Sequence, residues 1–322
     1  MERVAQPLIA KPAAWRQHSE TIAFAVMLAT LIVAPFLTYP LFLMQAMCFA
    51  LFAAAFNLLI GYVGLLSFGH ALYFGWASYL AAYSAKAWGF PPELALLTGT
   101  AAAAVCGAIA GALAIRRQGI YFAMITLALA QMMYFFAVRA KFTGGEDGIQ
   151  AVPRGHLFGL FDLGGEMTMY VFVLVIFLAG FLFIYRIIHS PFGEVLKAIR
   201  ENETRAISLG YKTERYKLTA FVLSATLAGL AGSMKALVVQ IASLTDVNWP
   251  MSGEVVLMSL VGGLGTIFGP VVGAFIILIM QYKLASLGEW VLVIQGVIFV
   301  ACVLLFRRGI IGELAHWLRI KL

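Results

Sequence analysis

The chain has 322 residues, of which 62% are hydrophobic and only 11% are charged, and its formal net charge is +7. Soluble domains carry about 25% charged residues, so this composition excludes an ordinary soluble protein and predicts a protein of the lipid bilayer. The basic residues stand at the ends of apolar runs, which argues against nucleic acid as a partner. Three cysteines lie singly inside such runs without metal-ligand spacing, so no metal site is expected: Cys48, Cys106 and Cys302.

Ten apolar segments follow one another along the chain, most of them close to the ~20 residues that span a ~30 Å hydrocarbon core. Backbone polar groups in lipid must be satisfied internally, so each segment predicts a helix. The expected segments are 21–39, 41–61, 66–87, 93–115, 119–138, 168–189, 215–238, 253–265, 267–286 and 289–306. The predicted fold is an all-α polytopic integral membrane protein with about 8–10 transmembrane helices, because the short segment 253–265 either crosses or re-enters.

The distribution of basic residues predicts an orientation. If the N-terminus lies inside and the chain crosses ten times, sixteen of the 22 Lys and Arg residues fall on the inside. The positive-inside rule favours this arrangement. We therefore expect a cytoplasmic N-terminal segment over 1–20, one membrane domain over 21–308 and a cytoplasmic C-terminal tail over 309–322.

One predicted inside loop is unusually polar. Ten of the chain's Asp, Glu, Lys and Arg residues lie in the 28 positions from Ser190 to Lys217. Ser190 can cap a helix that begins at Pro191, and Gly210 can end it. An apolar stripe that breaks near Glu203 predicts one amphipathic surface helix or two short ones, with its apolar side formed by Phe192, Val195, Leu196, Ile199, Ala206 and Ile207.

The polar side of this segment carries both signs of charge. Two i, i+4 ion pairs are expected, Lys197–Glu201 and Glu201–Arg205. Helices that lie at lipid headgroups usually present a face dominated by Lys and Arg, so the mixed face suits a protein partner better than an anionic bilayer. A helix lying passively at the headgroups is the alternative.

Four stretches in order along the chain resemble the permease subunits of branched-chain amino-acid ABC importers, of the LivM type. They are GYVGLLSFGHALYFG from Gly61, GIYFAMITLALAQ from Gly119 with TGGEDGIQAVP from Thr143, AIRENETRAISLGYKTERYKLTAFVLSATLAGLAGSM from Ala198, and VVLMSLVGGLGTIFGPVVGA from Val255. The resemblance implies a bacterial inner-membrane protein that forms half of a translocation pathway for branched-chain or similar hydrophobic amino acids. It also implies a second permease subunit, in a heterodimer, two cytoplasmic ATPase subunits and a periplasmic solute-binding protein.

In such importers a cytoplasmic helix of the permease docks on the ATPase. The resemblance places this coupling region at about 190–214, with ETRAISLG, which begins at Glu203, in the place of the family's docking motif. The segment departs from the family pattern, because Thr204 and Arg205 replace two alanines and the glycine comes one position later. The residues expected to couple to the ATPase are Glu194, Arg200, Glu201, Glu203, Arg205 and Gly210.

Two further sets of residues are candidate sites. The translocation path is expected to involve Asn57, Ser67, His70, Gly262, Gly263 and Gly265. A histidine in an apolar segment suggests function, although a structural hydrogen bond is the alternative, and the glycine-dense stretch predicts either a broken helix or tight packing. Glu146 and Asp147 in the outer loop are candidates for contact with the binding protein, or are simply solvated.

The remaining observations concern enzymatic motifs and alternative functions. The chain has no P-loop and none of the common hydrolase motifs, so we expect no enzymatic activity and no cofactor, with ATP bound by partner subunits. Within the same family, urea, short amides or aromatic compounds are alternative substrates. Outside it, an ion-coupled secondary transporter would need intramembrane acids or histidines, for which Glu254, Glu289 and His70 are candidates. A non-transporting scaffold is the third alternative.

Overall fold

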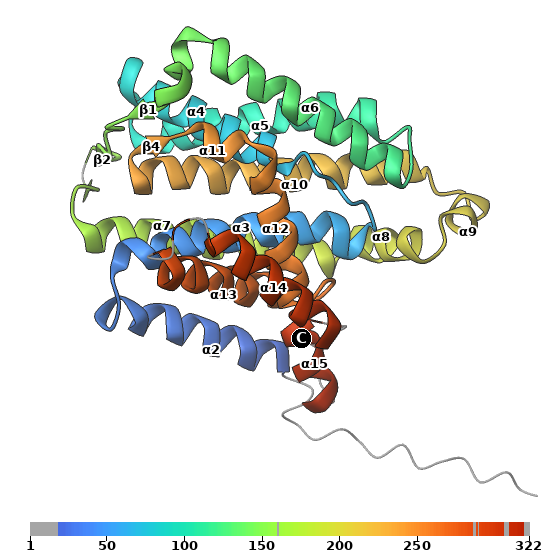
Figure 1. The fold of residues 1–322 in the computed structure, drawn as a ribbon. Coiled ribbons are helices and arrows are strands. Elements are labelled where there is room, and N and C mark those ends of the chain that lie inside the picture. The colour runs from blue at the N-terminus through green and yellow to red at the C-terminus, as the bar shows by residue number, and fades with distance from the viewer. Residues whose placement is uncertain (1–18, 160, 286–287, 289, 306–308, 319–322) are drawn as a thin grey trace, which may run out of the picture.

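A computed structural model describes residues 19–159, 161–285, 288, 290–305 and 309–318. It is a bundle of helices, most of which run along one common axis, and α8 and α9 project at one end (Figure 1). The helices are α2 Ser19–Val33, α3 Pro40–Tyr62, α4 His70–Ala87, α5 Pro92–Ala114, α6 Ile120–Arg139, α7 Glu166–Ile188, α8 Pro191–Glu201, α9 Glu203–Ser208, α10 Thr213–Val239, α11 Leu244–Val247, α12 Trp249–Gly262, α13 Gly269–Leu284, α14 Trp290–Leu305 and α15 Gly309–Leu318. Short 3₁₀ turns and strands complete the described chain: η1 Ala34–Phe36, η2 Lys141–Thr143, η3 Gly145–Asp147, β1 Ile149–Gln150, β2 His156–Leu157, β3 Phe161–Asp162 and β4 Ile241–Ala242.

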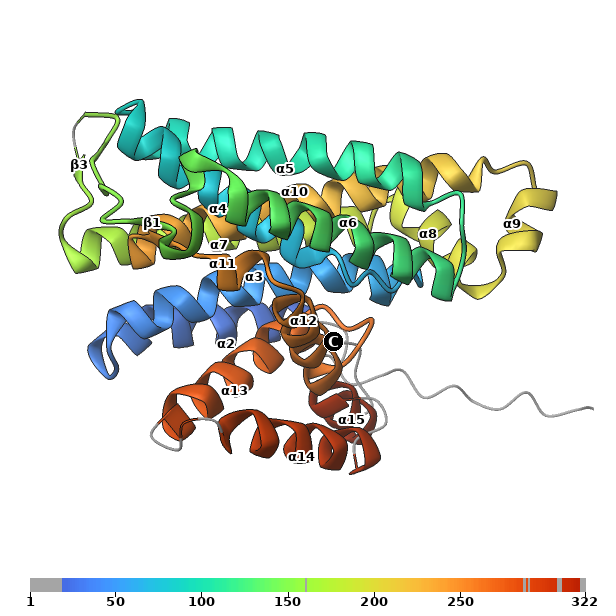
Figure 2. The same cartoon turned by 45° about the horizontal axis from the view of Figure 1, so that its top comes forward.

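Every apolar segment expected from the sequence contains a helix, and the all-α polytopic fold is confirmed. Among the described residues, six helices are long and apolar enough to cross a membrane: α2 with η1, α3, α5, α6, α7 and α10. The remaining expected segments form the shorter or more polar helices α4, α12, α13 and α14. Figure 2 shows that α13, α14 and α15 gather on the side of the bundle opposite α5.

The centre of the bundle consists of α3 and α10, which pack against each other and against α4 and α5. Small residues permit this close approach. A Cβ on Gly232 would overlap the backbone of Phe74 in α4, and a Cβ on Gly229 would overlap Ala103 in α5. Helices in lipid associate through van der Waals packing of this kind, because lipid tails are as apolar as the side chains.

One end of the bundle is organised by the loop between α6 and α7. Its strand β1 pairs with β4, which follows α10, in the antiparallel register Ile149↔Ala242. Lys86 at the end of α4 donates a hydrogen bond of 2.7 Å to the Gln150 carbonyl. These contacts hold the loop, which the sequence places outside, against the ends of α4 and α10.

The segment that follows β4 crosses the bundle. After β4 the chain turns into the bundle and forms α11. Asp246 of α11 forms a buried ion pair of 2.6 Å with Lys235 of α10, and Val247 packs against Gly75 in α4. Helix α12 then continues to the opposite end, where Gly265 meets Asn57 near the end of α3. The short segment 253–265 therefore does not re-enter. Its helix needs only 14 residues because β4 and α11 cover the first part of the path.

Both ends of the described chain lie at the end that carries α8 and α9. Glu20 near the start of α2 contacts Tyr185 and His189 at the end of α7. Gly309 at the start of α15 packs on Gly263. The expected C-terminal tail thus contains a helix, α15, that packs on α12 and α13. The expected N-terminal segment 1–20 falls almost wholly outside the described residues, as does Glu289.

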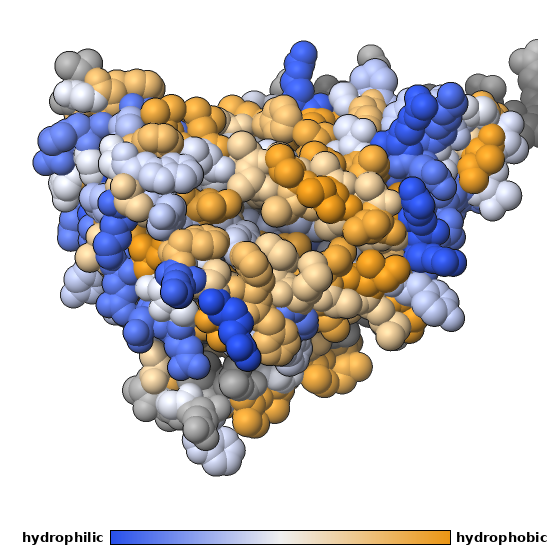
Figure 3. Space-filling model, turned by 90° about the horizontal axis from the view of Figure 1, so that it is seen from above, coloured by the Kyte–Doolittle hydropathy of each residue, from blue (hydrophilic) through white to orange (hydrophobic). Residues whose placement is uncertain are grey.

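The surface carries the pattern of a membrane protein. Figure 3 shows one face of the molecule, with hydrophilic residues gathered toward both ends of the bundle and hydrophobic residues between them. Exposed large apolar residues of α5 and α6 include Val105, Ile109 and Met124. A hydrophobic belt between two polar rims fits the hydrocarbon core of a bilayer.

We predict that Gly262, at the end of α12 where it meets α13, matters more for stability than Gly253 in the same helix. A Cβ on Gly262 would overlap the backbone of Gly269, whereas a Cβ on Gly253 in the same helix would meet nothing within 4 Å. Gly262→Ala should lower the unfolding free energy by about 1–3 kcal/mol through overpacking, and Gly253→Ala, which has open space and gains helix propensity, should not lower it. Thermal unfolding of the two purified variants in detergent measures the difference. Equal melting temperatures of the two variants would show that the contact between Gly262 and Gly269 can accommodate a Cβ and would contradict the prediction.

Candidate functional site

The polar segment after α7 folds as the sequence predicts at its start. The Ser190 hydroxyl accepts a hydrogen bond from the Gly193 amide at 3.3 Å, and Pro191 is the first residue of α8. Leu196 and Ile199 are buried, so the apolar side of α8 packs on the bundle. The predicted cap and the amphipathic character of α8 are both confirmed.

The predicted interruption near Glu203 is also present and separates α8 from α9. Asn202 adopts an extended conformation (φ −157°, ψ 98°), and its side chain accepts a hydrogen bond of 2.9 Å from the Arg205 amide. At the other end of α9, Gly210 has a φ of +90°, which ends the helix as predicted. The segment is therefore two short helices.

The two predicted i, i+4 ion pairs are wrong. The extended backbone at Asn202 separates Glu201 and Arg205, so these residues no longer lie one helical turn apart. Lys197 instead binds Glu194 at 2.9 Å, one turn earlier in α8. The hydrogen bond and the positive charge of Lys197 lower the pKa of the Glu194 carboxyl.

Arg200 attaches α8 to the membrane helices. Its guanidinium Nη1 donates a hydrogen bond to the carbonyl of Gly61, in the last turn of α3. The same guanidinium lies 3.2 Å from the position that a Cβ on Gly265 would occupy. Arg200 therefore touches both the end of α3 and the turn between α12 and α13.

Glu203 attaches α9 to the membrane helices. Its carboxylate forms a 2.5 Å ion pair with Lys217 of α10 and accepts a 2.9 Å hydrogen bond from Gln118. The Lys217 side chain is only 6% exposed, so this charge depends on Glu203 for compensation. The sequence analysis missed the role of Lys217; a lysine four residues into a long apolar helix was the available signal.

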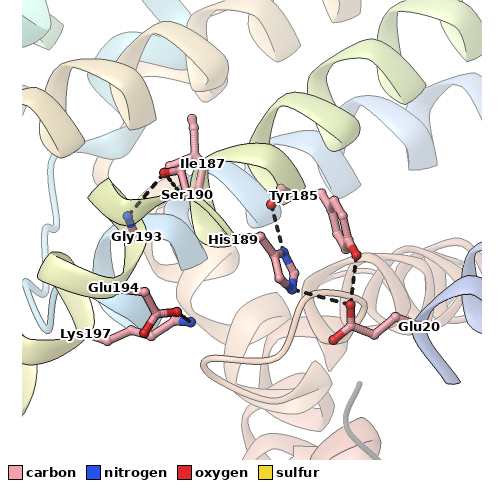
Figure 4. A network of polar contacts seen from close by, with 8 residues as sticks. All are labelled: Glu20, Tyr185, Ile187, His189, Ser190, Gly193, Glu194 and Lys197. Carbon is pink, nitrogen blue, oxygen red and sulfur yellow. Dashed lines mark hydrogen bonds and ion pairs between the residues drawn. The ribbon is translucent and has the colours of Figure 1, made fainter. Parts of the chain in front are cut away.

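A third contact joins α2 to the beginning of α8. Figure 4 shows that Glu20 points toward both Tyr185 and His189. The Tyr185 hydroxyl donates to Glu20 Oε2 at 3.0 Å, and His189 Nε2 lies 3.4 Å from the same oxygen. His189 immediately precedes the Ser190 cap, so the first described helix is tied to the point where α8 begins.

The rest of the segment forms an exposed surface, which we call the coupling surface. It consists of Glu194, Glu201, Thr204, Arg205, Ile207 and Leu209. Ile207 and Leu209 are 56% and 70% exposed, so the expectation that Ile207 packs inward is wrong, because the break at Asn202 reorients α9. Of the six residues expected to couple, all but Glu203 are exposed, and Arg200 and Glu203 also bind groups of this chain.

Four of the residues expected along a translocation path meet at the turn between α12 and α13, which we call the glycine turn. Asn57 donates from Nδ2 to the Thr266 carbonyl at 2.9 Å and accepts at Oδ1 from the Gly265 amide at 3.0 Å. Gly263 and Gly265 have φ values of +126° and +75°, which favour glycine. The turn is thus a tightly packed backbone structure held by one buried amide.

Ser67 and His70 lie elsewhere, fully buried within the chain. His70 Nε2 is 2.9 Å from Ser224 Oγ, and Ser224 donates its own proton to the Ala55 carbonyl. His70 must therefore donate from Nε2, so the neutral Nε2–H tautomer is the one that fits. The rings of Phe56, Tyr73 and Phe221 surround it edge to face. This is the structural hydrogen bond, and the expected path role of Ser67 and His70 stays a prediction.

The remaining acidic candidates are Glu254, Glu146 and Asp147. Glu254 is half-buried on α12, close to Gln281 of α13. Glu146 and Asp147 are exposed in η3, at the end of the bundle opposite the coupling surface. In the part of the chain that the structure describes, no three His, Cys, Asp or Glu residues come together as metal ligands.

Comparison with known protein families identifies the family of this chain. Residues 39–303 match the model of the branched-chain amino acid transport system / permease component family. The chain belongs to this family. The match runs from the N-terminus of α3 to within α14 and so contains both the coupling surface and the glycine turn. This permease chain is accordingly a multi-pass membrane component of a transport system.

Individual proteins that are similar to this chain are also named as transport permeases. The high-affinity branched-chain amino acid transport system permease protein LivM of Escherichia coli is 24% identical over 303 residues, covering 85% of this chain and 70% of the relative. The probable branched-chain amino acid transport permease protein LivH of Methanocaldococcus jannaschii is 31% identical over 51% of this chain and 53% of its own length. The fructose import permease protein FrcC of Rhizobium meliloti is 26% identical over 88% and 81%. No solved structure matches the chain.

We predict that Glu203 matters for the integrity of the permease rather than only for contact with a partner. Glu203→Gln leaves the buried Lys217 charge without its counterion and should lower the unfolding free energy by about 3 kcal/mol. The double variant Glu203→Gln with Lys217→Met should lose less than Glu203→Gln alone, because the buried charge is gone. Thermal unfolding in detergent measures both.

Glu201→Gln is the matched control, because Glu201 is exposed and forms no ion pair with a described residue. Its unfolding should equal that of the unmodified chain. A Glu203→Gln variant that is equally stable would show that Lys217 is solvated in the native protein.

Proposed function

We propose that this chain forms half of the translocation pathway of an ABC importer for branched-chain or similarly hydrophobic amino acids. The family match and the names of the LivM relatives support the substrate class. The observation that carries the mechanism is the coupling surface, an exposed patch of mixed charge and apolar side chains on two helices that are anchored to the membrane domain through Arg200 and Glu203.

The anchors give the coupling surface a mechanical role. A separate ATPase subunit binds Ile207 and Leu209 together with the acids and bases around them. When ATP closes the pair of ATPases, α8 and α9 move with them. Arg200 transmits this movement to the end of α3 and to the glycine turn, and Glu203 transmits it to α10. Access to the pathway then changes from one side of the membrane to the other.

The proposed assembly contains two ATPase subunits, a second permease subunit in a heterodimer and a solute-binding protein. The end of the bundle that carries α8 and α9 faces the cytoplasm of a bacterial cell, together with both chain ends, and the inner membrane is the location. Glu146 and Asp147, at the opposite end, contact the binding protein. This chain requires no cofactor and catalyses no reaction, since the ATPases bind ATP.

Transport in vesicles tests the proposed function. The permease pair, its ATPases and its binding protein, reconstituted in proteoliposomes, should import labelled leucine only when ATP is present on the ATPase side. Uptake that follows a proton or sodium gradient without ATP would contradict the mechanism. Relatives named as ribose and fructose import permeases show that the substrate class needs this direct measurement.

We predict that a charge at the apolar centre of the coupling surface disconnects the ATPase. Leu209 is 70% exposed and lies outside the hydrophobic core, so Leu209→Asp should weaken ATPase binding at least tenfold, about 1.4 kcal/mol, without altering thermal stability. Affinity measured by biolayer interferometry between the purified permease pair and the ATPase checks the loss, and ATP-driven uptake should fall in parallel.

Phe158→Asp provides the matched control. Phe158 is 72% exposed in the loop at the opposite end of the bundle, so the same chemical change there should leave ATPase affinity intact. Normal ATPase binding by Leu209→Asp would show that the ATPase binds a surface other than the coupling surface.

A further inference from the structure

Helix α2 lies apart from the rest of the bundle. Of its 15 residues only Ser19 and Leu31 are buried. Beside its Glu20 contact, it touches α7 through a hydrogen bond of 2.5 Å from the Tyr170 hydroxyl to the Leu31 carbonyl and through stacking of Phe24 on Phe181. Figure 1 shows α2 along the edge of the bundle, next to α13.

A groove of about 940 Å³ lies between α2 and α13, and apolar side chains form nearly all of its wall. Val26 and Leu37 line it from the side of α2, and Phe275 and Ile279 line it from α13. Its wall on α2 extends from Ala23 to Val33, which is roughly 15 Å at the rise of a helix, and continues past η1 to Thr38. The α2 part alone matches the ~15 Å of one leaflet's half of the hydrocarbon core.

The groove opens at one end into a second hollow of about 780 Å³, the mouth, whose wall is less apolar than that of the groove. The two hollows share Leu37, Thr38, Phe42 and Ile279, so they are continuous. The mouth adds the side chains of Tyr39, Tyr282 and Lys283, which carry two hydroxyl groups and an ammonium group. Lys283 is exposed and forms no ion pair with any residue that the structure describes.

We propose that the groove binds a glycerophospholipid, with its acyl chains between α2 and α13 and its phosphate at Lys283. The chemistry of the two hollows matches the two parts of such a molecule. A long apolar channel within the hydrophobic belt takes hydrocarbon, and a cation with tyrosine hydroxyls at the membrane interface takes an anionic headgroup. The mouth lies at the end opposite α8 and α9, so the lipid comes from the leaflet on that side.

The size and polarity of the groove suit a lipid better than the transported solute. The volume of the groove lies near the upper limit for ligand pockets, so it suits a molecule larger than a single amino acid. Its wall offers few polar groups to bind the charges of a zwitterion, so it is not suited to the transported solute. The site is independent of the proposed transport function and can be tested without any transport measurement.

The experiment measures phospholipid that stays bound. The permease pair is reconstituted in nanodiscs of phosphatidylcholine and phosphatidylglycerol, extracted into detergent, washed, and examined by native mass spectrometry. The unmodified protein should retain one phospholipid per copy of this chain. Lys283→Gln should reduce retention at least fivefold, Lys283→Arg should restore it, and Ala29→Phe, which places a ring in the groove, should abolish it.

Two matched controls lie outside the groove. Lys141→Gln removes an exposed cation at the same end of the bundle, and Ala108→Phe adds a ring to an exposed position on α5. Both should retain lipid like the unmodified protein. Equal retention in Lys283→Gln and in Lys141→Gln would overturn the proposal. If Ala29→Phe separates the permease pair while the lipid count is unchanged, the groove is a subunit interface and the proposal is wrong. If Ala29→Phe does not fold, the comparison of the two lysine variants decides.

Discussion

The hydrogen bond from Arg200 to the Gly61 carbonyl determines how the polar segment is attached to the membrane helices. The last carbonyls of a helix have no partner within it and carry the negative end of the helix dipole, so a guanidinium is well suited to this place. The same side chain lies beside Gly265, and Asn57, one turn earlier in α3, binds the backbone of Gly265 and Thr266. Two polar side chains thus combine the end of α3, helix α8 and the glycine turn into one unit.

This arrangement explains why glycine is concentrated in one stretch. A turn that must accept the Asn57 amide, lie beside Arg200 and allow Gly309 to pack on Gly263 has no space for a Cβ at several positions. Gly273 in α13 similarly faces the backbone of Met258 in α12. The glycines therefore serve tight packing, one of the two alternatives that the sequence left open. They also place a rigid turn within reach of the coupling helices, where a movement of α8 acts on it directly.

Much of the fold follows from the sequence because hydrophobic length is a local property. The apolar runs, the Ser190 cap, the break near Glu203 and the end at Gly210 all depend on neighbouring residues, and all are found in the structure. Pairings between distant residues were not predictable. Nothing local to Arg200 or Glu203 indicates that one binds the end of α3 and the other Lys217 of α10, so both were expected to face the ATPase. The exposure of Ile207 was missed for the same reason, since it depends on the conformation of Asn202.

The orientation of the coupling surface is the claim on which transport depends, and thiol labelling tests it most directly. In a chain without native cysteines, a cysteine replacing Ser208 in α9 and one replacing Glu146 in η3 lie exposed at opposite ends of the bundle. With a membrane-impermeant maleimide, right-side-out vesicles should label only the cysteine at 146 and inverted vesicles only the cysteine at 208. Labelling of the cysteine at 208 from the outside would place α8 and α9 beyond the reach of any cytoplasmic ATPase and contradict the mechanism.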